Sequence, residues 1–235
     1  MVAATPTQSR AFYVIKPMNL LIIGDVHGCI HTFSELLTHW RPATEHLIQV
    51  GDLVDRGRHV PETVALARQL SEQHPDTTTF LMGNHEQSML RHYGPEGPYL
   101  DWLEWGGRTT VAQYKARPRQ LAQHLPWLAQ RPLLWQNEHV LVSHAGLADS
   151  LHALDPTHPD GLLWRRGPLR KLPTQRQVVG HTPTDDGDPQ LDTDSDTIYL
   201  DTGAYLGRNL AGVRLTPTGE VLDMILIPTH ATDLR

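Results

Sequence analysis

The chain has little cysteine and no long apolar run, which excludes two common ways of stabilising or anchoring a protein. It holds one cysteine, Cys29, among 235 residues, so no disulfide can form within it. This fits a reducing compartment. No apolar run approaches the roughly 18–20 residues that cross a bilayer, and residues 1–17 lack the apolar core of a secretion signal. We therefore expect a cytoplasmic protein that does not bind membranes.

Positive charge is also scarce. The chain has 20 Lys and Arg residues against 26 Asp and Glu residues, a net charge of −6. This balance gives no reason to expect nucleic-acid binding. A site that handles phosphate must then concentrate positive charge locally, through metal ions and a few arginines. The length suits one globular domain, and because no long amphipathic helix is evident, we expect a monomer.

The first half alternates short apolar runs with helical patterns. Apolar runs at 19–23, 47–50 and 77–82 predict strands. Apolar residues three or four apart over 31–40 and 61–73 predict helices between them. This β-α-β-α-β order is typical of a parallel sheet with crossover helices, so the predicted fold class is α/β.

Residues 88–135 differ from the rest of the chain. They carry four of the six tryptophans and several prolines, and they predict a mostly helical cap insertion above the strand ends. We expect this insertion to belong to a single domain over residues 18–235, preceded by a flexible extension over residues 1–17.

The second half predicts shorter strands. Residues 139–143 and 176–180 are expected to continue the strand pattern. Turn signals between the last three apolar runs predict antiparallel pairing among strands at 197–200, 210–215 and 221–227. The acidic, turn-rich segment 185–196 is expected to be a solvated loop.

Five of the predicted strands end in residue types that bind metal. The residues are Asp25 and His27, Asp52, Asn84, His144 and His181. Oxygen ligands suit hard divalent ions, and imidazole adds a preference for Mn, Fe, Zn or Ni. Each residue alone is more often a turn residue or a structurally satisfied histidine. Their joint occurrence at equivalent strand ends, beside glycines, favours an enzyme with a two-metal site.

The motifs around these residues resemble those of a known family. GDLVDRG (51–57) with GNHE (83–86) is the more specific pair. The full series also includes GDVHG (24–28), SHAG (143–146) and GHTP (180–183). In this order, over residues 19–205, it resembles the phosphoprotein phosphatase branch of the calcineurin-like metallophosphoesterases. It is similar to the bacterial and phage serine/threonine protein phosphatases and to the related symmetrical diadenosine tetraphosphate hydrolases. WLEWGG (102–107) resembles the cap segment of this bacterial branch.

The resemblance implies a metallophosphoesterase-type four-layer αββα sandwich and a set of metal ligands. One divalent ion is expected on Asp25, His27 and Asp52. The other is expected on Asp52, Asn84, His144 and His181, with Asp52 shared. Mn²⁺ is the expected metal, and Fe, Zn, Ni or Mg are alternatives.

The resemblance also implies catalytic roles. His85 matches the family's proton donor, and Asp55 matches the carboxylate that orients it. Arg56 matches a phosphate-binding arginine. Arg165 matches a second one, although Arg166 stands next to it in the same motif. Glu86 and Asp201 match supporting positions near the metals.

These roles favour a phosphatase that hydrolyses phosphoserine and phosphothreonine monoesters by direct attack of a metal-bridging hydroxide. Its partner would be a phosphoprotein or a small phosphorylated substrate. The first alternative is a symmetrical dinucleoside tetraphosphate hydrolase, for which a nucleotide is the partner. The second is a metal- or phosphate-binding module without catalysis, which the intact set of catalytic residues disfavours.

The tryptophans of the cap bear on the substrate. Trp102, Trp105, Trp127 and Trp135 could stack on a nucleobase, although aromatic residues in a domain of this size more often belong to the core. Cys29 has no role in the expected chemistry.

Overall fold

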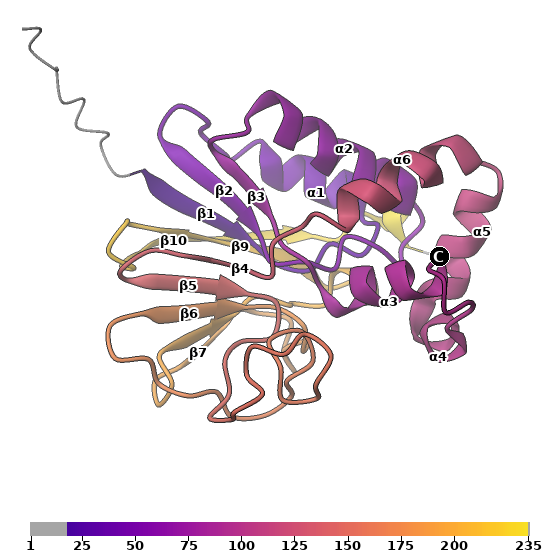
Figure 1. Ribbon diagram of the computed structural model, residues 1–235. Coiled ribbons are helices and arrows are strands. Elements are labelled where there is room, and N and C mark those ends of the chain that lie inside the picture. The colour runs from indigo at the N-terminus through magenta and orange to yellow at the C-terminus, as the bar shows by residue number, and fades with distance from the viewer. Residues whose placement is uncertain (1–17, 235) are drawn as a thin grey trace, which may run out of the picture.

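The computed structural model describes residues 18–234, so the extension expected over residues 1–17 lies outside the described residues. Two five-stranded mixed sheets pack face to face (Figure 1). The first sheet has the strand order β10-β9-β1-β2-β3, and the second has the order β4-β5-β6-β8-β7.

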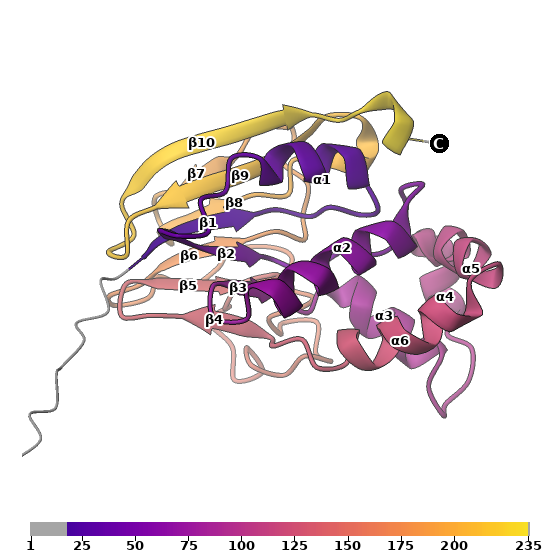
Figure 2. The ribbon, with the colours of Figure 1, turned by 90° about the horizontal axis from the view of Figure 1, so that it is seen from above.

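The first sheet is built from β1 (Asn19–Ile23), β2 (Glu45–Gln49), β3 (Thr78–Phe80), β9 (Asn209–Leu215) and β10 (Val221–Pro228). Strands β1, β2 and β3 run parallel, as the alternating pattern predicts. Helices α1 (Ile30–Leu37) and α2 (Val60–Gln73) lie over this sheet (Figure 2).

Side-chain alternation along β1 explains why its sequence is apolar throughout. Leu21 and Ile23 belong to the cluster beneath the helices, whereas Leu20 and Ile22 belong to the cluster between the two sheets. A strand that is buried on both faces reads as a continuous apolar run rather than an alternating one.

The second sheet is built from β4 (Leu134–Gln136), β5 (Val140–Ser143), β6 (Arg176–Val179), β7 (Gln190–Asp192) and β8 (Thr197–Tyr199). Strands β5, β6 and β8 are parallel, and the edge strands β4 and β7 are antiparallel. The outer face carries a small apolar cluster formed with turns and loops between β5 and β6. The α/β class with two facing sheets is confirmed. In the described part of the chain, helices cover the first sheet, and turns and loops cover the outer face of the second.

Three details of the strand prediction are wrong. β4 forms where only a helical insertion was expected, and β7 forms inside the predicted acidic loop. The antiparallel prediction holds for β9 and β10, but β8 lies in the other sheet and runs parallel to β6. Each of the two missed strands has three residues and is held by antiparallel pairing with the strand that follows it in the sequence.

The interval expected to form the cap contains a run of short helices. They are α3 (Asn84–His92), α4 (Leu100–Trp102), the π-helical turn η1 (Leu103–Gly107), α5 (Arg108–Lys115) and α6 (Pro118–Leu128). Trp102 and Tyr114 from this run are fully buried, and they share one apolar cluster with residues of β1 and α2. Figures 1 and 2 show these helices beside α2, beyond the carboxyl end of β3.

Among the described residues, none of the helices has the length and apolar character to cross a bilayer.

Candidate metal centre

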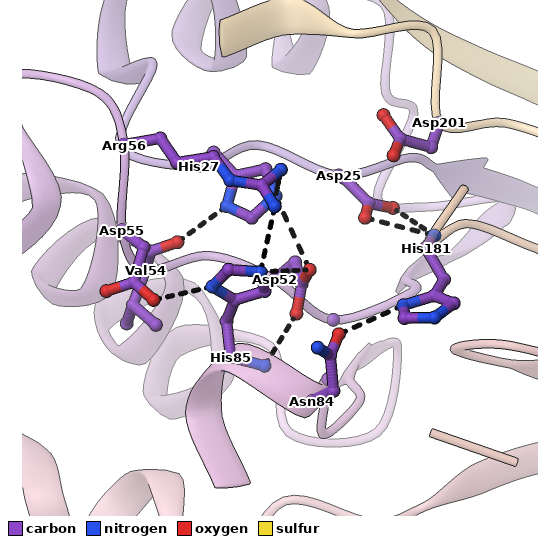
Figure 3. A network of polar contacts seen from close by, with 12 residues as sticks. Asp25, His27, Asp52, Val54, Asp55, Arg56, Asn84, His85, His181 and Asp201 are labelled. Carbon is purple, nitrogen blue, oxygen red and sulfur yellow. Dashed lines mark hydrogen bonds and ion pairs between the residues drawn. The ribbon is translucent and has the colours of Figure 1, made fainter. Parts of the chain in front are cut away.

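The predicted ligands lie at the carboxyl ends of parallel strands from both sheets. Asp25 follows β1, Asp52 follows β2 and Asn84 begins α3 just after β3. In the second sheet, His144 follows β5 and His181 follows β6. Because the two sheets face each other, these ends converge on one site, which Figure 3 shows for most of the residues. Asp201, which follows β8, lies beside Asp25 in the same view.

Asp52 stands at the middle of this site. Its Oδ2 lies 3.4 Å from Nε2 of His27, and its Oδ1 lies 3.5 Å from Nε2 of His144. Asp52 also shares one compact group of possible ligands with His27 and His85, and another with Asp25 and His144. One carboxylate between two groups of ligands is the arrangement expected of a residue that bridges two ions.

The local arrangement presents more lone pairs than protons, which suits cations. Oδ1 of Asn84 lies 2.8 Å from Nε2 of His144 and 3.0 Å from Nδ1 of His181, and these two nitrogens are 3.2 Å apart. Nδ1 of His144 donates to the carbonyl of Val50, and Nδ1 of His27 donates to that of Val54. These backbone contacts leave both Nε2 atoms with lone pairs aimed at the site, which is the usual arrangement of metal-binding histidines.

Buried carboxylates add unbalanced negative charge. Burial, with the charges of Asp201 and Asp52, raises the pKa of Asp25 well above its usual value. Burial is also the main reason that the pKa of Asp201 rises to about 6. Oδ2 of Asp201 and Nε2 of His181 are buried without a hydrogen-bond partner within residues 18–234. Divalent ions would relieve both the repulsion and the missing partners, so the residues present fit a two-metal centre.

His85 faces the centre but is bound to a different carboxylate. Its Nδ1 donates to Oδ2 of Asp55 at 2.5 Å, and its Nε2 points toward Oδ2 of Asp52 at 3.8 Å. Burial lowers the pKa of His85, but the charge of Asp52 and the hydrogen bond to Asp55 outweigh this effect and raise it. The raised pKa and the position of Nε2 are those expected of a proton donor.

The cap segment holds Asp55 in place, which the sequence did not reveal. The indole nitrogen of Trp102 donates to Oδ2 of Asp55 at 2.6 Å, and the hydroxyl of Thr110 donates to Oδ1 at 2.5 Å. Both side chains are fully buried. The only sequence signal was the resemblance of WLEWGG and the following threonines to a cap segment. Trp102 is thus a positioning residue rather than a base-stacking one.

Arg56 supplies positive charge at the edge of the site. Its Nη1 lies 2.9 Å from Nε2 of His27, its Nη2 lies 3.0 Å from Nε2 of His85, and its guanidinium covers the ring of Tyr205 at 4.0 Å. The fork of donors is suited to two oxygens of one phosphate.

The predicted second arginine, Arg165, is held by neighbours in its own loop. Nη1 of Arg165 is paired with Asp160 at 2.7 Å, and its Nη2 donates to the carbonyl of Pro168. The charge of the exposed Arg166, by contrast, contributes to lowering the pKa values of His144 and His181. Nη1 of Arg166 also lies 3.4 Å from the hydroxyl of Thr182, which follows the predicted ligand His181, whereas the motif had favoured Arg165.

The backbone is strained at the same residues. Six described residues other than glycine have a positive φ, and five of them belong to the site: His27 (45°), Asp52 (59°), Asp55 (73°), Arg56 (68°) and His181 (71°). Such conformations cost roughly 1–3 kcal/mol each and persist where a functional geometry requires them. Two positions require glycine because a carboxylate lies against the backbone. A methyl group on Gly83 would collide with the carboxylate of Asp52, and one on Gly180 would collide with that of Asp25.

Glu86 joins two of the strand-end loops. Its buried carboxylate accepts hydrogen bonds from the backbone nitrogens of Asp52, Leu53, Val54 and Gly83, at 2.8 to 3.1 Å. Burial and the charge of Asp52 raise its pKa to about 7, against the effect of these donors. Asp52 lies in one of these turns. Glu86, in the first turn of α3, therefore ties that turn to the start of the helix.

We expect Glu86→Gln to lower the free energy of unfolding by about 2–4 kcal/mol, because its amide group would face two backbone donors in place of an acceptor. Thermal unfolding of the chelated protein measures this loss. Glu72→Gln, in an exposed ion pair with Arg68, is the control and should change stability by less than about 1 kcal/mol. Equal stability of the two variants would contradict the role given to Glu86.

The sequence is similar to those of one known family. The sequence profile described as calcineurin-like phosphoesterase matches residues 18–206. A bis(5'-nucleosyl)-tetraphosphatase PrpE, labelled asymmetrical, from Bacillus mycoides is 29% identical over 227 residues, which cover 82% of this chain and 89% of that protein.

Solved structures share the fold. A Saccharomyces cerevisiae protein serine/threonine phosphatase superposes with a TM-score of 0.62 at 18% identity, covering 93% of this chain and 82% of that one. A protein provisionally described as a diadenosine tetraphosphatase gives a TM-score of 0.58 at 21% identity, covering 91% and 95%. The profile match spans most of the chain, including every predicted metal ligand, and the chain therefore belongs to the calcineurin-like phosphoesterase family.

Proposed function

We propose that this metallophosphoesterase hydrolyses a phosphoanhydride bond of dinucleoside polyphosphates. The similarity to the Bacillus tetraphosphatase, over most of both chains, carries the proposal. It reverses the order of the two enzymatic hypotheses drawn from the motifs, and it favours asymmetrical rather than symmetrical cleavage. Hydrolysis of phosphoserine and phosphothreonine is the second candidate, supported by the GDLVDRG and GNHE motifs.

A cavity next to the metal centre supports the nucleotide substrate. The Arg56 cavity, of about 510 Å³, is lined by Arg56, Gly57, residues 104–106, Tyr205, Leu206, Asp233 and Leu234. Its size is within the range of small-molecule sites. Trp105, one of the lining residues, is 39% exposed, while Trp102 is buried and Trp127 packs against Phe80. Of the four cap tryptophans that were considered, Trp105 is therefore the proposed stacking partner of a base, although its ring also meets those of Tyr99 and Trp164 edge to face.

The chain's own residues have distinct tasks in this reaction. Asp25, His27, Asp52, Asn84, His144 and His181 would hold two divalent ions, with Mn²⁺ as the proposed metal. Bound ions of this kind lower the pKa of water and stabilise charge on phosphate oxygens. Arg56 would bind two oxygens of the phosphate under attack, and Arg166 would add positive charge near His181. His85, oriented by Asp55, gives its Nε2 proton to the departing oxygen.

The test compares kcat/KM for diadenosine tetraphosphate and for a phosphothreonine peptide with Mn²⁺, on one preparation. We expect a preference of at least about tenfold for the dinucleotide. Asymmetrical cleavage would release a nucleoside monophosphate and a triphosphate, whereas symmetrical cleavage would release two diphosphates. A preference for the peptide would move the assignment to a protein phosphatase. Activity on neither substrate would reject both candidates.

Trp105→Ala sharpens this test. We expect it to raise KM for the dinucleotide about tenfold or more, because base stacking on an aromatic side chain contributes roughly 1–3 kcal/mol. Turnover of p-nitrophenyl phosphate, which has no nucleobase, should stay unchanged. Leu100→Ala is the matched control, since Leu100 is 66% exposed in the same segment. Equal KM values for the two variants would remove Trp105 from the substrate site.

A further inference from the structure

Two histidines and a carboxylate from distant parts of the chain meet outside the metal centre. His31 is the second residue of α1, His59 directly precedes α2, and Asp233 lies in the last turn of the chain, η3 (Ala231–Asp233). Each offers a ligand atom, and these atoms lie within 4.8 Å of one another. The same closeness is found within residues 18–234 in two other groups only, and both belong to the metal centre.

Asp233 is held firmly in position. It is fully buried, and its Oδ2 accepts hydrogen bonds from the backbone nitrogen and the hydroxyl of Thr32, at 2.8 and 2.7 Å. Its Oδ1 accepts one hydrogen bond, from the backbone nitrogen of His31 at 3.1 Å. The Asp233 carbonyl also accepts from the backbone nitrogen of Arg58. The carboxylate thus caps α1, and Oδ1 retains a lone pair.

The two imidazoles lie close enough to Asp233 and to each other to share one ligand. Nε2 of His59 lies 3.0 Å from the carbonyl of Thr232, a backbone contact of the kind that orients metal-binding histidines. The rings of His31 and His59 meet edge to face at 5.0 Å between centroids. In the described part of the chain, the ring nitrogens of His31 have no hydrogen-bond partner and His31 is exposed, so an ion could reach it from solvent.

We propose that His31, His59 and Asp233 form a third cation site that takes Zn²⁺ or a similar late first-row divalent ion. Two imidazoles and one carboxylate suit Zn²⁺, Ni²⁺ or Co²⁺ better than Mg²⁺ or Ca²⁺, which prefer oxygen ligands alone. Water would complete the coordination. This inference is independent of the substrate proposed above.

Its position gives the site a structural role. The ion would tie the C-terminal turn to the starts of α1 and α2, which directly follow the GDVHG and GDLVDRG motifs. Asp233 also lines the Arg56 cavity. An ion at this site would therefore stabilise one wall of that cavity and the two loops that carry Asp25, Asp52 and Arg56, without taking part in the chemistry.

The test uses the full chain, stripped with chelator, reloaded with Zn²⁺ and freed of excess ion. Bound zinc is counted for the unchanged protein, for His31→Gln, for His59→Ala and for His39→Ala. His39 is an exposed histidine whose side chain has no role in the group, so it controls for loose binding to surface imidazoles. Asp233 is left unchanged because its carboxylate caps α1.

We expect the unchanged protein and His39→Ala to hold one more zinc ion per chain than the other two variants. This difference does not depend on how fully the catalytic centre is loaded. At an ion concentration about 100 times its dissociation constant, zinc should raise Tm by about 5–10 °C more in the unchanged protein than in His31→Gln. Equal zinc counts in all four proteins, or an equal loss in His39→Ala, would overturn the proposal.

Discussion

Replacing His85 with Asn is expected to lower turnover of a phosphothreonine peptide by about 10²–10⁴-fold while leaving metal content nearly unchanged. His85 reaches the centre through Nε2, but its Nδ1 is bound to Asp55 and its pKa is raised, which suits a proton donor more than a ligand. Asn keeps an amide N–H near the place of Nδ1, but it has no group at the place of Nε2 and cannot transfer the proton. Steady-state turnover and metal analysis of the same preparation measure the two effects separately.

The size of the His85 effect should also depend on the leaving group. A phosphoanhydride or p-nitrophenyl phosphate releases an oxygen that needs little protonation, so the loss should be smaller with these substrates than with the peptide. Equal losses on all three substrates would contradict a proton-donor role. Loss of metal in the variant would show instead that His85 is a ligand.

Replacing Asp52 with Asn should empty or disorder both metal sites and abolish turnover, with a loss of at least about 10³-fold. Asp52 lies between the two groups of ligands, so removing its charge weakens both. The chelated variant should also lose stability, because the charges of His144 and His85 outweigh burial and hold the pKa of Asp52 well below its usual value. Metal counts per chain and thermal unfolding measure these outcomes.

Asp186→Asn is the control for Asp52→Asn. Asp186 is an exposed carboxylate in the loop before β7 and is not one of the predicted ligands. This variant should keep two ions and full turnover. Retention of two tightly bound ions by Asp52→Asn would refute the bridging role, whatever its turnover.

Much of the fold could be predicted from local patterns. The apolar run of β1 and the helical spacing of α1 and α2 are strong signals, because burial on both faces or on one helical face leaves a clear mark in the sequence. The strands β4 and β7 left no such mark. Each is a short edge strand, and its conformation is set by backbone pairing with β5 or β8 rather than by its own side chains.

The candidate site also combines features that the sequence reveals with features that it does not. The ligand types could be read from the strand ends, since parallel strands bring their carboxyl ends together whatever lies between them. The support of Asp55 by Trp102 and Thr110 could not, because it depends on how a helical segment about 50 residues further along packs. The positive φ angles at His27, Asp52 and His181 were also hidden, since no residue preference predicts strain that the surrounding structure imposes.

The most direct test of a two-metal hydrolase is a titration of the chelated protein with Mn²⁺, in which bound metal and p-nitrophenyl phosphate turnover are followed together. Mn²⁺ is the suitable ion, because the proposed third site, with the imidazoles of His31 and His59, should bind Mn²⁺ more weakly than Zn²⁺. That site should therefore add little to the count of bound metal. We expect two ions per chain at saturation, with turnover rising as the second ion binds. Full turnover with one ion per chain, or with none, would contradict the account.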